Sequence, residues 1–361
     1  MKEAVFLGLV DDIKSEDMAK QEDAANKICA VKDKNLLPAI NRLLLEDENM
    51  LVKRVMLWTL HNYRGLSYKD YLAFLASEDF YVREAAQRLF IDGGRPAVDV
   101  LVAAVENGSA AEQFSAVETL GQFRDSAAVK PLLCAANLPD ESIREIAVMS
   151  LGIYPDEEVT AALFAALEDV PAVRLAALSG LKGRAMSESD AAKVASHLLD
   201  ADEEIRAACV YVLDAHTPDS AANDSAAAVR RAFASVTLST DILARLCGDY
   251  DSSVRTAAAD ALGKLKAPRA DVLIPMLKDE VPGVRRAAAA ALACSDAPET
   301  VQALIEALND PKPGIRAAAA NALGTIGGPE AIAALRAAMQ VKNPILSGMI
   351  KNALERAEKQ Q

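Results

Sequence analysis

Apolar residues recur at helical spacing along the chain, in pairs of segments that are separated by short turns. In one segment, Val301, Leu304 and Leu308 fall on one stripe of a helix. A polar turn at residues 309–314 follows, and a second segment begins at Ile315-Arg316. Runs that alternate β-branched and polar residues, the pattern expected of strands, are absent from the sequence. The pattern therefore predicts an all-α protein built from helix pairs.

The second helix of each pair carries a motif. An aliphatic anchor is followed directly by a basic residue, a small residue stands four positions past the anchor, and Leu stands eight past it. The basic residue recurs every 30 to 32 positions, allowing for a degenerate copy at Glu112-Gln113, in this series: Lys53, Arg83, Arg144, Arg174, Arg206, Arg255, Arg285 and Arg316. The one exception is the 49 residues from Arg206 to Arg255. About eleven helix pairs and one inserted helix therefore account for the chain.

The regularity of the motif divides the chain, which we expect to be a single repeat domain over residues 1–361. Residues 1–216 hold divergent repeats, and residues 239–342 hold repeats close to the consensus. Between them, residues 217–238 form an interruption, with a polar loop and a helix carrying Arg230 and Arg231. This interruption is either a functional insertion or a tolerated surface extension. Residues 343–361 grow polar toward the end, as a terminal capping helix does.

Aspartate and arginine recur six residues apart where the turn meets the second helix. The pairs are Asp200 and Arg206, Asp249 and Arg255, Asp279 and Arg285, and Asp310 and Arg316. This spacing lets the carboxylate accept turn N–H groups and pair with the arginine six residues later. We predict a structural ladder of such pairs. The alternative, an anion-binding row of arginines, is weaker because each arginine has a local aspartate.

The motif Asp-x5-Arg-x-x-Ala-Ala-x-x-Leu-Gly, clearest in residues 249–324, resembles the HEAT-like repeats of phycobilin lyases. The resemblance covers essentially the whole chain and weakens before residue 50. It implies a HEAT-like solenoid, a right-handed α-α superhelix, in which the second helix of each pair lines the concave side. Because related arrays serve as adaptors, enzyme subunits and cofactor-attachment helpers, the resemblance predicts the fold more sharply than the function.

The charge and the cysteines limit the partners and the location. The chain has 39 Lys and Arg against 52 Asp and Glu, a formal charge of −13, and no basic cluster, which argues against nucleic acid as a partner. The five cysteines form no Cys-x-x-Cys pair and suit a reducing cytoplasm. The apolar stretch after Met1 is short for a signal peptide, and no run is long enough to cross a bilayer. We therefore expect a cytoplasmic protein without a membrane segment.

The sequence offers little for catalysis or for a cofactor. The three histidines, His61, His197 and His216, stand alone, and no His-Glu pair of the HEAT-type deoxyhypusine hydroxylases is present. The histidines and cysteines lack zinc-ligand spacing, and Gly-x-Ser-x-Gly and Walker-type loops are missing. The net charge also argues against a HEAT-like DNA glycosylase. We expect no enzyme activity, no cofactor and no metal.

Candidate binding residues follow from the register of the second helix. Positions two and six past the anchor should face the concave side, and bulky or charged groups gather there in the first half of the chain. The candidates for protein binding are Arg54, Trp58, Arg88, Phe114, Glu118, Met149, Leu175 and Tyr211. Fourteen of the sixteen aromatic residues lie at or before Tyr211, and aromatic residues carry much of the energy of interfaces. The alternative is that these groups belong to the repeat core.

Two functions agree with these observations. The first is an intracellular scaffold or adaptor that binds a partner protein through its concave face. The second is an accessory or lyase-like subunit that assists tetrapyrrole attachment or enzyme maturation together with a partner. Coloured, tetrapyrrole-bound protein on purification would favour the second, and co-purification of a defined protein without a chromophore would favour the first.

Overall fold

The computed structural model describes residues 1–63, 66–340 and 343–359, and all regular elements in these residues are helical. The chain divides into two compact units, Met1–Leu181 (unit 1) and Lys182–Gln361 (unit 2). The protein is thus an all-helical array of helix pairs, in which each pair has a first and a second helix.

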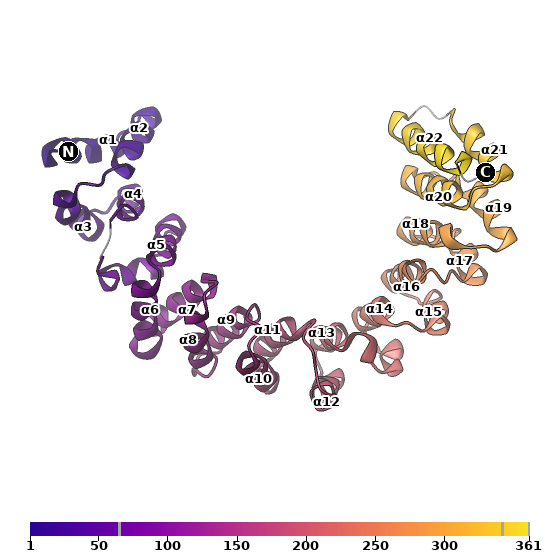
Figure 1. The fold of residues 1–361 in the computed structure, drawn as a ribbon, viewed down its shortest axis with the longest axis horizontal. Helices are drawn as coiled ribbons and strands as arrows, with labels where there is room; N and C mark the ends of the chain where they lie inside the picture. The colour runs from indigo at the N-terminus through magenta and orange to yellow at the C-terminus, as the bar shows by residue number, and fades with distance from the viewer. Residues whose placement is uncertain (64–65, 341–342, 360–361) are drawn as a thin grey trace. The chain divides into compact units, whose positions relative to one another are not determined.

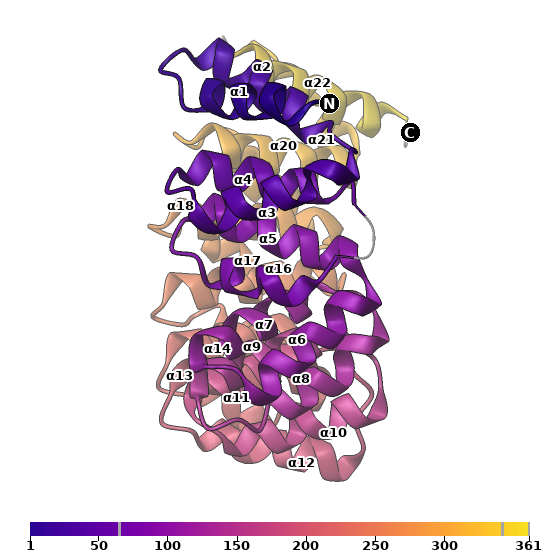
Figure 2. The ribbon, with the colours of Figure 1, turned by 90° about the vertical axis from the view of Figure 1, so that its left-hand side faces the viewer.

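Unit 1 stacks its helix pairs in chain order, with first helices on one side and second helices on the other (Figures 1 and 2). The first elements are α1 (Glu3–Ile13), α3 (Leu37–Glu46), the 3₁₀ segment η2 (Tyr68–Ala76), α6 (Arg95–Asn107), α8 (Val129–Ala135) and α10 (Glu157–Ala165). The second helices are α2 (Met18–Cys29), α4 (Met50–Leu60), α5 (Phe80–Gly93), α7 (Ala110–Gln122), α9 (Glu141–Leu151) and α11 (Pro171–Leu181). Short 3₁₀ turns η1 (Lys34–Leu36), η3 (Ser126–Ala128) and η4 (Ala166–Glu168) flank α3, α8 and α10.

Unit 2 repeats the arrangement. Its first elements are α12 (Glu188–Ser196), the 3₁₀ segment η7 (Asp219–Asn223), α15 (Thr240–Leu246), α17 (Ala270–Met276), α19 (Pro298–Ala307) and α21 (Pro329–Ala338). Its second helices are α13 (Glu203–Leu213), α14 (Ala227–Val236), α16 (Ser252–Lys264), α18 (Pro282–Ala291), α20 (Pro313–Ile326) and α22 (Pro344–Glu358). The 3₁₀ turns η5 (His197–Leu199), η6 (Asp214–His216) and η8 (Leu292–Cys294) complete the unit. Residues 360–361 of the predicted capping helix lie outside the described residues.

The predicted interruption is an ordinary repeat with a shortened first element. Helix α14 packs against α13 on one side and α16 on the other, as a second helix does. Its anchor is Val229, which is buried, and η7 stands where the first helix of the pair would be. The described residues therefore contain twelve pairs, in place of eleven pairs and one inserted helix. The polar loop predicted at 217–225 is mostly η7, in which Ala221 and Ala222 are buried.

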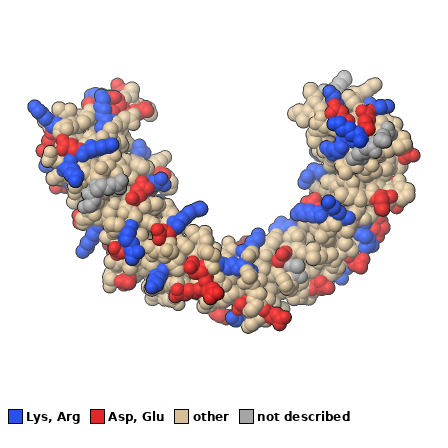
Figure 3. Space-filling model, viewed as in Figure 1, with Lys and Arg blue, Asp and Glu red and all other residues tan. Residues whose placement is uncertain are grey.

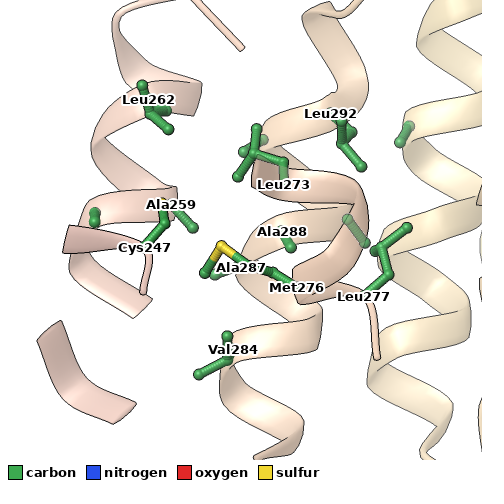
Figure 4. Packing of buried hydrophobic residues seen from close by; sticks show 14 of the residues in the cluster. Cys247, Ala259, Leu262, Leu273, Met276, Leu277, Val284, Ala287, Ala288 and Leu292 are labelled. Atoms are coloured by element: carbon green, nitrogen blue, oxygen red, sulfur yellow. The ribbon is translucent and has the colours of Figure 1, made fainter. Parts of the chain in front are cut away.

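The motif residues form the core of each unit. In unit 2, the anchors and the small and leucine positions of the second helices are buried against the first helices (Figure 4). Val284 and Ala288 of α18, and Leu292 directly after its end, are each 0% exposed. Burying such apolar side chains supplies about 25 cal/mol per Å² of surface removed from water. Because each repeat covers the apolar face of the next, this core runs on from pair to pair.

The glycine that ends the motif lets consecutive second helices approach closely. A Cβ on Gly324 of α20 would lie 2.6 Å from the carbonyl oxygen of Ala353 in α22. A Cβ on Gly263 of α16 would lie 3.0 Å from the Cα of Ala291. In unit 1, Gly152 faces Gly180 in the same way, also at 3.0 Å. Where a repeat has glycine nine positions past its anchor, the missing side chain therefore makes room for the next second helix.

Candidate protein-binding faces

In unit 1, the residues two and six positions past the anchors lie on the side of the second helices that is opposite the buried anchors. These helices are α4, α5, α7, α9 and α11. We call this surface the second-helix face of unit 1. It includes seven of the eight residues predicted for protein binding: Arg54, Trp58, Arg88, Phe114, Glu118, Met149 and Leu175. The eighth, Tyr211, lies on α13 in unit 2.

The predicted residues are not core residues. Trp58, Phe114 and Met149 are 40%, 37% and 58% exposed, and Arg88 is exposed as well. Arg54, Glu118 and Leu175 are half-buried. The side chains of Trp58, Arg88, Phe114 and Met149 are therefore accessible to a partner.

Contacts between neighbouring side chains hold several of these groups in place. The Trp58 ring stacks on His61, with centroids 4.9 Å apart and planes inclined by 19°. The Arg54 guanidinium lies 5.2 Å from the centroid of the Tyr81 ring, a cation–π distance that ties α4 to α5. The Gln87 amide donates a hydrogen bond of 2.7 Å to Glu118 of α7. Such contacts reduce the side-chain entropy that binding would otherwise remove.

An exposed aromatic pair at the start of α5 was not predicted from the sequence. Phe80 and Tyr81 are 61% and 56% exposed, and their rings meet edge to face with centroids 5.4 Å apart. They stand two positions and one position before the anchor Val82, whereas the predicted binding residues were all taken from positions after the anchors. The signal was available, because two adjacent aromatics directly before a Val-Arg pair do not fit the core stripe of the helix.

The predicted ladder exists in unit 2 with a different pairing. Each arginine donates through Nη1 to the backbone carbonyl six residues before it, as Arg255 does to Asp249 at 2.9 Å. Its Nε and Nη2 then reach the aspartate of the next repeat, so the prediction that the carboxylate partner lies six residues earlier was wrong. The pairs are Arg206 with Asp224, Arg230 with Asp249, Arg255 with Asp279, and Arg285 with Asp310. The ladder thus joins consecutive repeats.

The aspartate carboxylates also accept N–H groups of the turns, as predicted. The carboxylate of Asp200 accepts the Asp202 N–H at 2.9 Å, and that of Asp310 accepts the Lys312 N–H at 2.8 Å. Arg316 donates to the carbonyl of Asp310 at 2.7 Å. Its Nε is buried and has no hydrogen-bond acceptor among the described residues.

The Arg230–Asp249 pair is the most buried of the ladder. The two side chains are 5% and 8% exposed, and Nε and Nη2 of Arg230 contact the carboxylate at 2.7 and 2.9 Å. Burial alone would raise the pKa of Asp249, but hydrogen bonds from Arg230 and from the Asp251 N–H outweigh it and hold the pKa below its usual value. In the sequence, this repeat is marked by Asp224, which stands six residues before Arg230. It was not recognised because Arg230 follows Arg206 by only 24 residues, which is shorter than the usual repeat.

Tyr211 lies in a cavity of about 660 Å³ in unit 2, lined by residues from 182–191, 211–216 and Val236. The Tyr211 side chain is 38% exposed, and the Lys182 ammonium lies 5.1 Å from the centroid of its ring. The cavity wall carries charges of both signs, including Glu188, Asp214 and Lys182. This mixture gives the cavity no single preferred ligand charge.

The chemistry of the remaining side chains is limited. Across residues 1–63, 66–340 and 343–359, no three His, Cys, Asp or Glu residues are grouped so as to hold a metal ion. Burial raises the pKa of the Cys247 thiol to about 12, which keeps it protonated at neutral pH. No helix in the part of the chain that the structure describes is long and apolar enough to span a membrane.

Comparison with known proteins agrees with this architecture. A family model of HEAT repeats matches residues 98–182, 198–293 and 270–354, which together make up more than half of the chain. The chain therefore belongs to the HEAT-repeat family. The match is to HEAT repeats in general, and membership of the phycobilin-lyase group stays a prediction. No curated protein matches the sequence.

Solved structures with a similar fold include several of importin-β. The Kap95:Nup1 complex aligns with a TM-score of 0.72 at 13% identity, over 100% of this chain and 62% of that chain. Yeast importin-β (Kap95p) aligns with a TM-score of 0.66 at 13% identity, over 99% and 61%. A further importin-β structure, in an ammonium sulfate condition, gives 0.63 at 13% identity, over 98% and 61%. The chain spans about three fifths of these proteins, and the similarity concerns the fold.

Proposed function

We propose that this protein is a scaffold that binds a partner protein through the second-helix face of unit 1. The observation that carries the proposal is the row of exposed, large side chains at positions two and six past the anchors. Trp58, Phe114 and Met149 are more than a third exposed on three separate second helices. Aromatic, methionine and arginine side chains are enriched at protein interfaces.

The fixed geometry of the row supports the same proposal. Trp58 rests on His61, and Arg54 rests on Tyr81, so both large groups are held before a partner arrives. Ordering a long side chain costs about 0.5–1.5 kcal/mol on binding, and prior ordering avoids that cost. The exposed Phe80 and Tyr81 extend the row at the start of α5, and we include them in the proposed surface.

The fold comparisons are compatible with this role. The importin-β structures that resemble the chain include one described as a complex with Nup1 and one described with RanGDP. Those partners are properties of importin-β. For this chain they support only the general proposal that a HEAT array of this kind binds proteins, and the partner is to be identified by experiment.

Affinity capture from an extract of the source cells, with variants of the full chain, tests the proposal. Trp58→Ala and Met149→Ala should each lose a protein that the unchanged chain retains, because removal of a central interface side chain costs about 2 kcal/mol or more. Leu45→Ala is the matched control. Leu45 is 67% exposed on the first helix α3, away from the second-helix face, and its truncation should leave capture unchanged.

Thermal unfolding of the same variants separates binding from packing. The melting temperature of Trp58→Ala should stay close to that of the unchanged chain, because Trp58 is 40% exposed. If Trp58→Ala and Tyr211→Ala each melt several degrees lower while capture is intact, these residues serve packing and the proposal fails. A visible tetrapyrrole absorption band in the purified protein, with no protein captured, would favour the cofactor-handling role instead.

A further inference from the structure

Unit 2 contains a second candidate surface, in repeats whose sequence indicates only structural spacers. A cavity of about 640 Å³ opens between α18, α20 and α22. Its floor is made of small side chains, among them Ala290, Ala317 and Ala318, and its outer wall is Ile345 and Met349 of α22. Ile345 is 78% exposed and Met349 37%. The volume suits one large apolar side chain and the adjoining backbone of a bound segment.

The cavity has a single charged group. Arg286 of α18 is exposed at its edge, and no carboxylate pairs with Arg286 among the described residues. Asn321 and Thr325 add polar groups, and the lining contains no Asp or Glu. Polar groups of this kind can orient the backbone of a bound segment, while Arg286 favours a carboxylate beside it.

The charge of the surrounding surface has the opposite sign to that of the whole chain. The anchor of α22 is Leu346, which is buried like the other anchors. On α14, α16, α18, α20 and α22, the positions two, six and ten past the anchors hold four cations and one anion: Arg231, Lys264, Arg286 and Arg356, and Asp260. These positions therefore sum to +3, in a chain of net charge −13. Figure 3 shows Lys and Arg, in blue, on the side of unit 2 formed by α14, α16 and α18. This surface attracts acidic partners while the rest of the chain repels them.

We propose that this surface binds an acidic peptide segment of a partner protein, which inserts one large aliphatic or aromatic side chain between α18, α20 and α22. The carboxylates of the segment lie along Arg286, Lys264 and Arg231, and the apolar side chain contacts Ala290, Ala317 and Met349. Nucleic acid suits the surface less well, because an apolar cavity offers nothing to phosphates and the four cations are spread over four helices. This proposal does not depend on the second-helix face of unit 1.

Selection of random twelve-residue peptides against the full chain provides the probe. Enriched peptides should combine several Asp or Glu residues with one Leu, Ile, Phe or Met. Fluorescence anisotropy of one such labelled peptide then measures affinity for the variants. Replacing its apolar residue by Ser, or raising the salt from 0.05 to 0.5 M, should each weaken binding by roughly tenfold.

Two variants of the surface and two controls locate the binding. Arg286→Glu reverses the charge at the cavity edge, and Ala290→Phe fills the cavity from an exposed position. Each should weaken binding by ~10-fold or more. Lys278→Glu makes the same charge change at the end of α17, where Lys278 is 81% exposed, and should leave affinity within about twofold. Trp58→Ala should also leave it unchanged, which separates this test from that of unit 1.

Several results would overturn the proposal. These are a selection without enrichment, enriched peptides without acidic residues, or equal affinity for Arg286→Glu. Displacement of the peptide by a single-stranded oligonucleotide at similar concentration would assign the surface to nucleic acid. Self-association of the chain that Arg286→Glu abolishes would assign it to a second copy. If Ala290→Phe fails to fold by circular dichroism, Arg286→Glu decides the question.

Discussion

The two units join their repeats with different chemistry. In unit 1, neutral side chains reach back one repeat to a backbone carbonyl: the Tyr63 hydroxyl donates to Asp33 at 3.0 Å and the Tyr154 hydroxyl to Phe123 at 2.6 Å. In unit 2, four consecutive Arg–Asp pairs reach forward one repeat. In unit 1, Arg144 and Asp169 show the same two-point pairing, at 2.7 Å. The same helix-pair scaffold is therefore held by two kinds of link.

This difference indicates why the surfaces of the units differ. In unit 2 the ladder arginine and aspartate link a repeat to its neighbours. The alanine positions of its second helix let the neighbouring helices pack closely. In unit 1 the links include individual tyrosines such as Tyr63 and Tyr154. The second helices of this unit carry Trp58, Phe114 and Met149. Four experiments test whether the two units are stabilised in these different ways.

Acid should produce the largest difference in stability between the two units, because it protonates the aspartates of all four Arg–Asp pairs of unit 2. Burial would raise the pKa of Asp224, Asp249, Asp279 and Asp310, but arginine and backbone hydrogen bonds outweigh it and the pKa of each is lowered. A lowered folded-state pKa means that the stabilisation is complete above the unfolded-state pKa of about 3.9 and is lost as the pH falls through the folded value. Hydrogen exchange between pH 5 and pH 2.5, corrected for intrinsic rates, should show unit 2 opening first. Earlier opening of unit 1 would contradict the comparison.

Removal of one ladder arginine should produce the next largest effect. Arg230→Ala leaves the Asp249 carboxylate, which is 8% exposed, without its partner and should cost about 3–5 kcal/mol in the free energy of unfolding of unit 2. Arg269→Ala is the control, because Arg269 also contacts two aspartates but is 35% exposed, and its loss should cost less than about 1 kcal/mol. Urea unfolding followed by hydrogen exchange measures both, and similar costs would show that burial of the ladder is unimportant.

The close packing of second helices gives a smaller effect. Gly324→Ala would force a Cβ to 2.6 Å from the Ala353 carbonyl oxygen and should cost about 1–3 kcal/mol. Gly348→Ala in α22 meets nothing within 4 Å and should instead stabilise the helix by roughly 0.5–1 kcal/mol. Chemical denaturation of the two variants tests the opposite signs. A stabilising Gly324→Ala would refute the packing role of the motif glycine.

The smallest effect is expected in unit 1. Tyr154→Phe removes the hydroxyl that donates to Phe123 and leaves that carbonyl without this donor, which should cost about 1 kcal/mol. The cost should be independent of salt, because no charge is involved. Tyr250→Phe in unit 2 is the comparison: Tyr250 is 78% exposed and its hydroxyl contact to Ser225 is 3.3 Å, so the change should lie within about 0.5 kcal/mol. Hydrogen exchange near Phe123 reports the local loss.

Much of the fold was predictable, because the anchor, the small residue and the leucine of each second helix recur at fixed spacing. The repeat containing α14 was not recognised, since its first element is the short η7 and the arginine spacing falls to 24 and 25 residues there. A search for a period near 31 residues passes over such a repeat, although Asp224 and Arg230 keep the six-residue spacing of the motif.

The sites were predictable only in part. The exposed positions past the anchors follow from helical geometry, which is why Trp58 and Met149 lie on the expected face. The ladder partners could not be assigned, because spacing shows which groups are neighbours in one repeat and not which way a long arginine side chain points. The cavity beside Arg286 depends on the wall formed by Ile345 and Met349 of the next helix, and alanine-rich repeats alone do not reveal it.

The forward direction of the ladder makes the repeats of α14, α16 and α18 each both a donor and an acceptor, so the joints between these repeats have the same parts. A segment running from one ladder arginine to the residue before the next, such as 255–284, is therefore an interchangeable module. Its deletion would place Arg285 directly after Val254, and Asp249 would then lie six residues before Arg285, as it now does before Arg255. Arrays of this kind can lengthen or shorten by whole modules without the design of a new joint.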